Sequence, residues 1–310
     1  MRVRSLATRR IREPGFLAVC SVLRLQPRAH SGFKAPAPLY NWTLLTQAQR
    51  ERINVVLVSP RNPLNIGAVA RAMANFGFAR LAVVAAYEPH WREARSAIGA
   101  PELLKNATET ATLAETISDR TFVIGTGTLT HRKPEQPVVS LPSLAPLVRT
   151  ELDRGGKIAL VFGPEKHGLT RDDLSYCHIL VEIPTDARQP SINLGQAAAV
   201  CLYELAARTI PDVVSDNNDR SAQKHFNNNA GEKLAISATS GNLDILSGLI
   251  EEVMVAAAYS PRTMQAANRH SIRLLLRKLN LNSADSRRTM GLFRRILWRI
   301  RRMSSRNVTN

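Results

Sequence analysis

Short apolar runs recur through the middle of this chain, and they limit its fold to a few classes. Each run holds four to six residues, many of them β-branched, and a small or polar residue or a proline follows each one. Runs of this kind are typical of strands that are buried on both faces of a sheet. Five are present, at residues 53–58, 81–85, 121–124, 158–162 and 179–183.

Segments with helical character alternate with these runs. We expect one helix over residues 64–76, ended by Gly77, and a long amphipathic helix over residues 194–208, closed by Pro211. Residues 103–116 also carry helix formers. Alternation of strands and helices predicts an α/β fold, with a mostly parallel sheet and helices on both faces. Ligands of such sheets bind beyond the carboxyl ends of the strands.

The formal net charge of +17 is concentrated at the two ends of the 310-residue chain. Residues 1–50 hold nine Lys and Arg against one acid, and residues 262–306 hold thirteen against one. Basic ends fit a polyanion such as nucleic acid, because each neutralised phosphate releases a counterion. An anionic membrane surface is the competing partner. No uninterrupted apolar run reaches the ~18 residues that a membrane span needs.

Composition divides the chain into four segments. Residues 1–50 form a basic extension that we expect to be disordered, although their Arg-rich, acid-poor composition also fits an organellar transit peptide. Residues 51–210 hold the α/β domain. Residues 211–241 are polar, lack apolar periodicity and are expected to form a flexible linker. Residues 242–310 form a basic extension in which apolar stripes predict three short helices. The stripes are Leu243, Leu246, Ile250 and Val253; Ile272, Leu275, Leu276 and Leu279; and Phe293, Ile296, Leu297 and Ile300.

Cysteines and histidines give no sign of a metal site. The three cysteines are odd in number and fit no metal-ligand spacing, and the seven histidines are scattered. This cysteine usage suits a reducing cytosol, so we expect a cytoplasmic protein. Gly125-Thr-Gly127 lacks the third glycine and the downstream acid of a dinucleotide fingerprint, which argues against NAD.

Three motifs follow one another along the α/β domain. They are Asn65-Ile-Gly-Ala-Val-Ala-Arg71, Val161-Phe-Gly-Pro-Glu-Lys-His-Gly-Leu169, and a segment from Ile183 through Pro190-Ser-Ile-Asn193 to Ala198. In this order they resemble the signature motifs of the SpoU branch of the SPOUT RNA methyltransferases, over about residues 53–210. The segment 161–205 is most similar to the TrmJ subfamily, which methylates a ribose 2′-hydroxyl in the tRNA anticodon loop.

The resemblance implies a fold, an activity and partners. The fold is the SPOUT α/β domain with a C-terminal trefoil knot, followed by a helical extension like that of the TrmJ family. The implied activity is S-adenosylmethionine-dependent 2′-O-methylation of RNA. The implied substrate is tRNA, modified at cytidine or uridine 32 of the anticodon loop. The resemblance also implies a homodimer, with the helix at 194–208 as the candidate interface; burial in the core would explain the same apolar face. RNA is therefore favoured over a membrane as the partner of the basic ends, and no metal is implied.

The implied S-adenosylmethionine site lies in three turns at the ends of strands. Glycine in such turns lets bare backbone groups approach an adenine edge and a ribose. Taken alone, the same turns are ordinary strand-to-helix connections. The residues implied to contact the cofactor are Thr126, Gly127, Thr128, Gly163, Ile183, Pro190, Ser191 and Ile192.

Arg71 matches the catalytic arginine of the family. An arginine in such small, apolar surroundings otherwise snorkels to solvent or pairs with an acid of the core. Because a guanidinium does not readily give up its proton, we do not expect Arg71 to act as a general base. We expect it to bind the adjoining phosphate and to stabilise negative charge that develops on the 2′-oxygen.

Four more polar residues complete the predicted catalytic set. Asn65 lies near the start of a helix, where it can cap the helix or reach a ligand. Glu165 can fix its loop, pair with Arg71 or remain a solvated acid. Ser191 can cap the next helix or take part in catalysis, and Asn193 is expected to hydrogen-bond the hydroxyl or the methyl donor.

Two other functions stay open from the sequence. The enzyme can act on ribosomal RNA instead of tRNA, or the chain can be a non-catalytic RNA-binding protein with the same fold. The complete catalytic set argues against the second. The low aromatic content of 5% favours recognition of RNA by shape and phosphate contacts over base stacking.

Overall fold

The structure is a computed structural model that describes residues 45–127, 134–206 and 235–307. Most of the predicted N-terminal extension and of the predicted linker therefore lie outside the described residues. The described end of the extension is folded: a short helix, α1 (Gln47–Arg50), begins at Thr46, whose side chain accepts from the Gln49 N–H in a capping box. Leu45 before it is buried. No described helix is long and apolar enough to cross a membrane.

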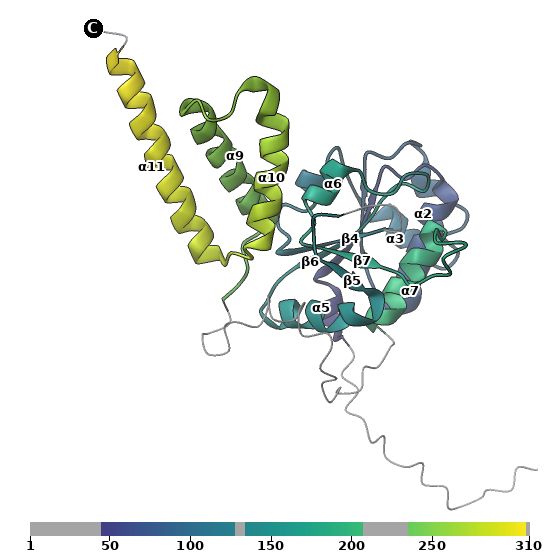
Figure 1. Cartoon of the computed structure of the whole chain (residues 1–310). Helices are drawn as coiled ribbons and strands as arrows, with labels where there is room; N and C mark the ends of the chain where they lie inside the picture. The colour runs from purple at the N-terminus through teal and green to yellow at the C-terminus, as the bar shows by residue number, and fades with distance from the viewer. Residues whose placement is uncertain (1–44, 128–133, 207–234, 308–310) are drawn as a thin grey trace, which may run out of the picture. The chain divides into compact units, whose positions relative to one another are not determined.

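A seven-stranded sheet forms the centre of the domain (Figure 1). Every neighbouring pair is parallel, and the strand order is β3-β2-β1-β6-β4-β7-β5. The strands are β1 (Ile53–Val58), β2 (Arg80–Val84), β3 (Thr108–Thr110), β4 (Phe122–Thr126), β5 (Val138–Ser140), β6 (Ile158–Phe162) and β7 (Ile179–Glu182).

Helices cover both faces of the sheet, as the sequence predicts. All six residues of β1 are buried. Val55 and Leu57 pack into one core with α2 (Pro63–Phe76), α3 (Pro101–Lys105), α5 (Leu144–Asp153) and α7 (Leu194–Ala206). Val56 and Val58 face the opposite core with α4 (Leu113–Thr116) and α6 (Arg171–Ser175). The predicted α/β class is therefore confirmed; the trefoil knot stays a prediction.

The local sequence explains where the first long helix begins and ends. The Asn62 side chain accepts from the Leu64 N–H and Pro63 occupies the first turn, so α2 starts one residue earlier than predicted. Gly77 ends it with φ 73°, a left-handed conformation that suits glycine. Helix α7 packs closely on α2 at Gly195. A Cβ at this position would lie only 2.7 Å from the Ala68 Cβ, so the close approach requires glycine.

The prediction for residues 103–116 is wrong. Helix formers there suggest one helix, but the structure has α3, then edge strand β3, then α4. Asn106 ends α3, and Thr108–Thr110 pairs with β2, which an extended β-branched segment does readily. Strand β5 and helix α5, together with the one-turn helices at Trp91–Glu93 and Leu141–Ser143, were not predicted.

The C-terminal extension forms three helices with a small core of their own. They are α9 (Ser240–Ala256), α10 (Gln265–Lys278), which follows a turn at Arg262–Met264, and α11 (Ser283–Asn307). The three helices are predicted correctly, but α11 has 25 residues and is not short. Leu243, Leu246, Ile272 and Leu276 are buried in the shared core, as their stripes predict. Leu275 and Leu279 are exposed instead.

The start of the extension is bonded to the α/β domain. The Ser240 N–H donates to the Arg120 carbonyl oxygen (2.7 Å). The Ser237 hydroxyl donates to Oε2 of buried Glu151 (3.1 Å). Burial raises the pKa of Glu151, although hydrogen bonds from Thr121 and Ser237 oppose the rise. Residues 237–241, within the predicted flexible linker, are thus packed in place.

Buried Arg277 makes a second connection, between α10 and α6. Its Nε donates to the Tyr176 carbonyl oxygen (2.8 Å), and its Nη2 lies 3.0 Å from the Asp244 Oδ1. Arg273 also lies over the Tyr176 ring, 4.3 Å from its centroid. Burial raises the pKa of Asp244, and the charge of Arg277 opposes this rise. The extension is therefore anchored next to the segment that follows β6.

Candidate functional site

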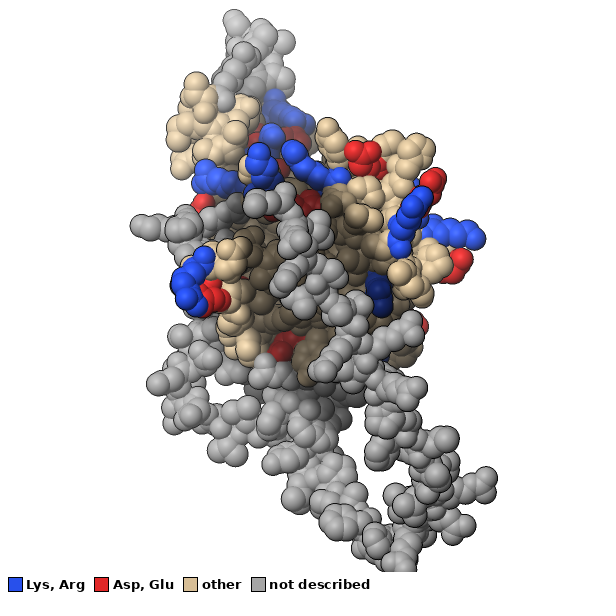
Figure 2. Space-filling view, turned by 90° about the vertical axis from the view of Figure 1, so that its right-hand side faces the viewer, with Lys and Arg blue, Asp and Glu red and all other residues tan. Residues whose placement is uncertain are grey.

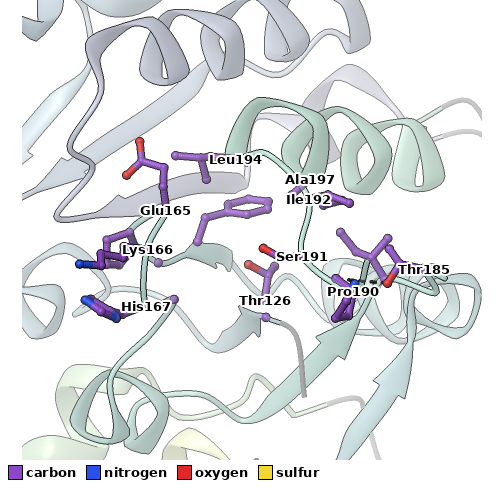
Figure 3. Close-up of a pocket in the computed structure, with 16 residues that line it drawn as sticks. Thr126, Glu165, Lys166, His167, Thr185, Pro190, Ser191, Ile192, Leu194 and Ala197 are labelled. Atoms are coloured by element: carbon purple, nitrogen blue, oxygen red, sulfur yellow. Dashed lines mark hydrogen bonds between the residues drawn. The ribbon is translucent and has the colours of Figure 1, made fainter. Parts of the chain in front are cut away.

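A cavity of about 220 Å³ lies beyond the carboxyl ends of β4, β6 and β7. Figure 3 shows its walls, which come from the loops that follow these strands and from the start of α7. This position is where the strand order predicts a ligand site. The cavity is lined by Thr126, Gly127, Phe162, Gly163, Pro164, Glu165, Lys166, His167, Gly168, Ile183, Thr185, Pro190, Ser191, Ile192, Leu194 and Ala197.

The loop after β6 folds back tightly on its own start. The Gly168 N–H donates to the Pro164 carbonyl oxygen (2.8 Å). A Cβ at Gly163 would collide with the backbone N of Leu169 and with the backbone of Gly168. Only glycine fits at this close approach, so Gly163 is required by the shape of the wall.

The other two walls are fixed by hydrogen bonds to backbone carbonyls. At the end of β4, the buried Thr126 hydroxyl donates to the Val161 carbonyl oxygen in β6 (3.0 Å). In the loop after β7, the Thr185 hydroxyl donates to the Pro190 carbonyl oxygen (3.1 Å) and closes residues 185–190 into a turn. These hydrogen bonds therefore define the backbone course of the two walls.

Three polar side chains on the rim form one network across the starts of α2 and α7. Asn65 Nδ2 donates to Glu165 Oε1 (2.8 Å), and Asn193 Nδ2 donates to Asn65 Oδ1 (2.9 Å). The backbone N–H groups of Arg61 and Asn62 also donate to the Glu165 carboxylate, at 3.1 and 3.2 Å. Burial opposes ionisation of Glu165, but these hydrogen bonds outweigh it and lower the pKa of Glu165 overall.

Asn193, and not Ser191, caps α7. The Asn193 Oδ1 accepts from the Gly195 N–H (2.8 Å), and the Gln196 side chain accepts from the Asn193 N–H (3.3 Å). Ser191 lines the cavity two residues earlier, before the start of α7. Asn193 combines the capping bond with the bond to Asn65, which fixes the orientation of its amide.

Arg71 lies apart from this network. Its side chain is exposed on α2, and within the described part of the chain it makes no hydrogen bond or ion pair. Glu165 bonds to Asn65 and to backbone N–H groups instead, so the two residues do not form the ion pair that was one interpretation of Glu165. A guanidinium with no protein partner here is free to meet an anionic ligand.

The structure brings together most of the residues predicted from the sequence. Seven of the eight predicted cofactor contacts line the cavity; the eighth, Thr128, lies outside the described residues. Glu165 and Ser191 line it as well, and Asn65 and Asn193 join it through Glu165. Eight further lining residues were not predicted from the sequence: Phe162, Pro164, Lys166, His167, Gly168, Thr185, Leu194 and Ala197. Lys166 and Gly168 belong to the second motif, so their position beside Glu165 was an available signal.

A metal centre is not part of this arrangement. Among the residues whose placement is described, no group of three or more His, Cys, Asp or Glu side chains could hold a metal ion. Cys177 and His178 lie next to each other but are both buried, and burial raises the pKa of the Cys177 thiol to about 12. Val123 donates its N–H to His178 Nδ1 (3.1 Å), so these two residues belong to the core.

Comparison with known proteins places this chain in a family. A model described as the SpoU rRNA Methylase family matches residues 52–203. The tRNA (cytidine-2′-O-)-methyltransferase TrmJ of Methanocaldococcus jannaschii is 37% identical over 175 residues, which cover 56% of this chain and 75% of that protein. The tRNA (cytidine/uridine/adenosine-2′-O-)-methyltransferase TrmJ of Pseudomonas aeruginosa is 38% identical over 50% of this chain, but the match spans only 60% of its own length.

A solved structure extends the similarity beyond the matched sequence. The crystal structure of TrmJ from Z. mobilis ZM4 superposes with a TM-score of 0.64 and 26% identity, covering 78% of this chain and 98% of that one. The fold, the two motifs that line the cavity, the first motif joined to them through Glu165 and the Methanocaldococcus relative agree with the resemblance inferred from the sequence. The chain belongs to the SpoU rRNA Methylase family.

Proposed function

We propose that this protein transfers a methyl group from S-adenosylmethionine to a ribose 2′-hydroxyl of tRNA, in the anticodon loop at cytidine or uridine 32. The observation that carries the proposal is the juxtaposition at one sheet edge of the three-walled cavity and the Asn65–Glu165–Asn193 network. The printed activities of the TrmJ relatives support this reaction and this class of RNA.

The residues of the cavity fit S-adenosylmethionine. Backbone groups at Gly127 and Gly163 are suited to the polar edge of an adenine, because a glycine has no side chain of its own to keep a ligand away from its backbone. Ile183, Ile192 and Leu194 supply an apolar lining for its faces. When bound, the cofactor supplies an activated methyl group on a positively charged sulfur.

The protein's own groups then have to place the ribose and manage charge. We assign Arg71 to the phosphate next to the target nucleotide and to the negative charge that develops on the 2′-oxygen. One N–H of the Asn193 amide is used by Asn65. We assign the other to the substrate hydroxyl, whose proton leaves to a phosphate oxygen or to water.

The basic extension supplies affinity for the RNA backbone. Helix α11 carries seven arginines between residues 287 and 302, at 287, 288, 294, 295, 299, 301 and 302. On the face drawn in Figure 2, Lys and Arg side chains stand mainly around the margin of the described surface. Arginines repeated along one helix, as in α11, can follow a phosphate backbone without reading its sequence.

We further propose a cytoplasmic homodimer, with the outer face of α7 as its interface. Val200 and Tyr203 on this helix are 41% and 50% exposed. The Tyr203 ring also meets the Phe76 ring edge to face, with centroids 6.0 Å apart, so α2 contributes to the same surface. Exposed apolar groups that cluster in this way mark protein interfaces.

One assay tests the reaction and the substrate together. Purified full-length protein is incubated with radiolabelled S-adenosylmethionine and either total tRNA or ribosomal RNA, and the methylated ribose is then mapped. We expect label in tRNA at one nucleotide. Label in ribosomal RNA alone would move the substrate to that class, in keeping with the name of the matched family. RNA binding without any transfer would identify a non-catalytic binder.

The Arg71→Ala variant tests the mechanism. It should lower the rate of transfer at least ~100-fold, the cost of removing one group that stabilises transition-state charge. Its affinity for S-adenosylmethionine should stay unchanged, because Arg71 does not line the cavity. Arg80→Ala is the matched control: Arg80 is also exposed but is the first residue of β2, at the amino end of the strand and away from the carboxyl ends where the cavity lies. A near-normal rate for Arg71→Ala would refute the assigned role.

A further inference from the structure

An exposed tyrosine and an arginine stand together beside the network at the cavity rim. Tyr87 is 70% exposed, and the Arg61 guanidinium carbon lies 5.7 Å from the centroid of its ring. The two residues follow β1 and β2, whose carboxyl ends are in register at Val58 and Val84. We call this pair the Arg61–Tyr87 platform.

Backbone hydrogen bonds fix the two loops of the platform to each other. The Ser59 N–H donates to the Val84 carbonyl oxygen (2.8 Å), and the Tyr87 N–H donates to the Pro60 carbonyl oxygen (3.4 Å). Ser59 and Ala85 also adopt left-handed φ values of 45° and 46°, which are uncommon for residues other than glycine. The chain therefore holds a specific conformation at the point where Tyr87 is presented to solvent.

The platform is also bonded to the proposed catalytic network. The Arg61 N–H donates to Glu165 Oε2 (3.1 Å), while Glu165 Oε1 accepts from Asn65 (2.8 Å). The same carboxylate lines the cavity. Glu165 thus links the backbone of the platform to the residues of the cavity rim.

A second arginine–aromatic pair in the chain shows what a purely structural pair looks like. Arg92 lies 4.3 Å from the centroid of the Trp91 ring, which is fully buried, and it donates to Glu109 (2.6 Å). Tyr87 is open to solvent instead. Within the described residues, the Arg61 guanidinium contacts no acid. The Arg61–Tyr87 platform therefore offers a ligand an exposed aromatic ring and a cation that no acid neutralises.

We propose that an unpaired base of the RNA substrate stacks on the Arg61–Tyr87 platform while a neighbouring ribose is methylated, an inference that rests on the proposed function. In a stacked RNA strand the neighbouring nucleotides limit access to a ribose hydroxyl. A base that leaves the stack to open this access loses its stacking contacts and needs a new stacking partner. Aromatic rings and guanidinium planes accept any unstacked base on their faces. The platform thus favours RNA that is single-stranded near the target. This role differs from the expectation, drawn from the low aromatic content, that base stacking contributes little to RNA recognition.

Three variants test the stacking. Tyr87→Ala removes the ring, Tyr87→Phe keeps the ring without its hydroxyl, and Arg92→Lys perturbs the buried pair as a control. With the tRNA identified by methyl mapping, Tyr87→Ala should raise KM for RNA about tenfold, the effect of losing one stacked base. Its kcat at saturating RNA and its affinity for S-adenosylmethionine should be retained. Tyr87→Phe and Arg92→Lys should behave like the wild type.

Substrates and binding data separate this proposal from the reaction itself. tRNAs that carry a single abasic ribose, at the target or next to it, are compared with the intact tRNA. The wild type should lose affinity at one of these positions, and Tyr87→Ala should lose nothing further there. Affinity is also measured by fluorescence anisotropy without the cofactor, so the platform is judged even if no methyl is transferred. Equal RNA affinity and KM for Tyr87→Ala and wild type would overturn the platform, as would a Tyr87→Phe variant impaired as much as Tyr87→Ala.

Discussion

Gly163→Ala is the change for which the structure gives the clearest expectation about cofactor binding. The added Cβ would meet three backbone atoms of residues 168 and 169, and it would lie 2.8 Å from the most distant of them, the Gly168 Cα. Backbone atoms cannot rotate away, so the loop 163–169 has to open. Overpacking of this kind costs about 1–3 kcal/mol. The loop forms one wall of the cavity, so much of that cost should appear when the wall closes on a ligand.

We therefore expect Gly163→Ala to weaken S-adenosylmethionine binding by roughly 5- to 150-fold, since about 1.4 kcal/mol corresponds to a factor of ten. Isothermal titration calorimetry measures the affinity, and urea denaturation measures how much of the cost falls on folding. Gly248→Ala is the control, because a Cβ at this position in α9 meets nothing within 4 Å. It should leave cofactor affinity unchanged and stabilise the fold by about 0.5–1 kcal/mol. Wild-type affinity and stability for Gly163→Ala would refute the steric argument.

Three further predictions concern stability and RNA binding. Arg277→Met should destabilise the protein by about 3 kcal/mol in urea denaturation, because it leaves Asp244 and the Tyr176 carbonyl without their buried partner; adding Asp244→Leu should recover part of the loss, and no recovery would count against a pairwise cause. Burial, aided by the charge of Arg277, lowers the pKa of His178 to about 3 from an ordinary value of 6.5. Between these values the unfolded chain binds a proton that the folded protein does not, so stability should fall as pH drops through this window, and His178→Asn should flatten the fall measured by denaturation at several pH values. RNA affinity measured by filter binding should fall steeply as salt rises, because the arginines of α11 release counterions from phosphates; a flat response would contradict backbone binding.

The fold was predictable where hydrophobic pattern and local signals agree. The strand at Ile53–Val58 and the helix ended by Gly77 lie where β-branched content and a glycine cap indicate. Strands β3 and β5 have three residues each and gain their order from neighbours in the sheet, which no local pattern reveals. The exposure of Leu275 and Leu279 also depends on tertiary packing. Helix α10 packs into its core through Ile272 and Leu276 and leaves these two leucines exposed.

The site was predictable as a set of residues but not as a set of contacts. The motifs indicate Gly163, Ser191 and Ile192, and the carboxyl-end rule indicates where they meet. The bonds from Asn65 to Glu165 and from Asn193 to Asn65 join residues 100 and 128 positions apart, so the choice of Asn65 over Arg71 as partner of Glu165 depends on side-chain orientation in the folded chain. The choice of Asn193 over Ser191 as helix cap is local and depends on which side chain reaches the Gly195 N–H. The Arg61–Tyr87 platform lies in loops outside the three motifs, and only their three-dimensional proximity shows it.

The order of strands has a consequence for how the protein is made. Strand β7 is the last of the seven to be synthesised, yet it lies between β4 and β5. Strand β4 can pair with β6 earlier, but neither β4 nor β5 can pair with β7 until residue 182 has left the ribosome. The nascent domain therefore carries two open strand edges for much of its synthesis, and pairing across such sequence distances is slow. Chaperones that shield such edges should raise its yield more than they would for a protein whose strands pair in the order of the chain.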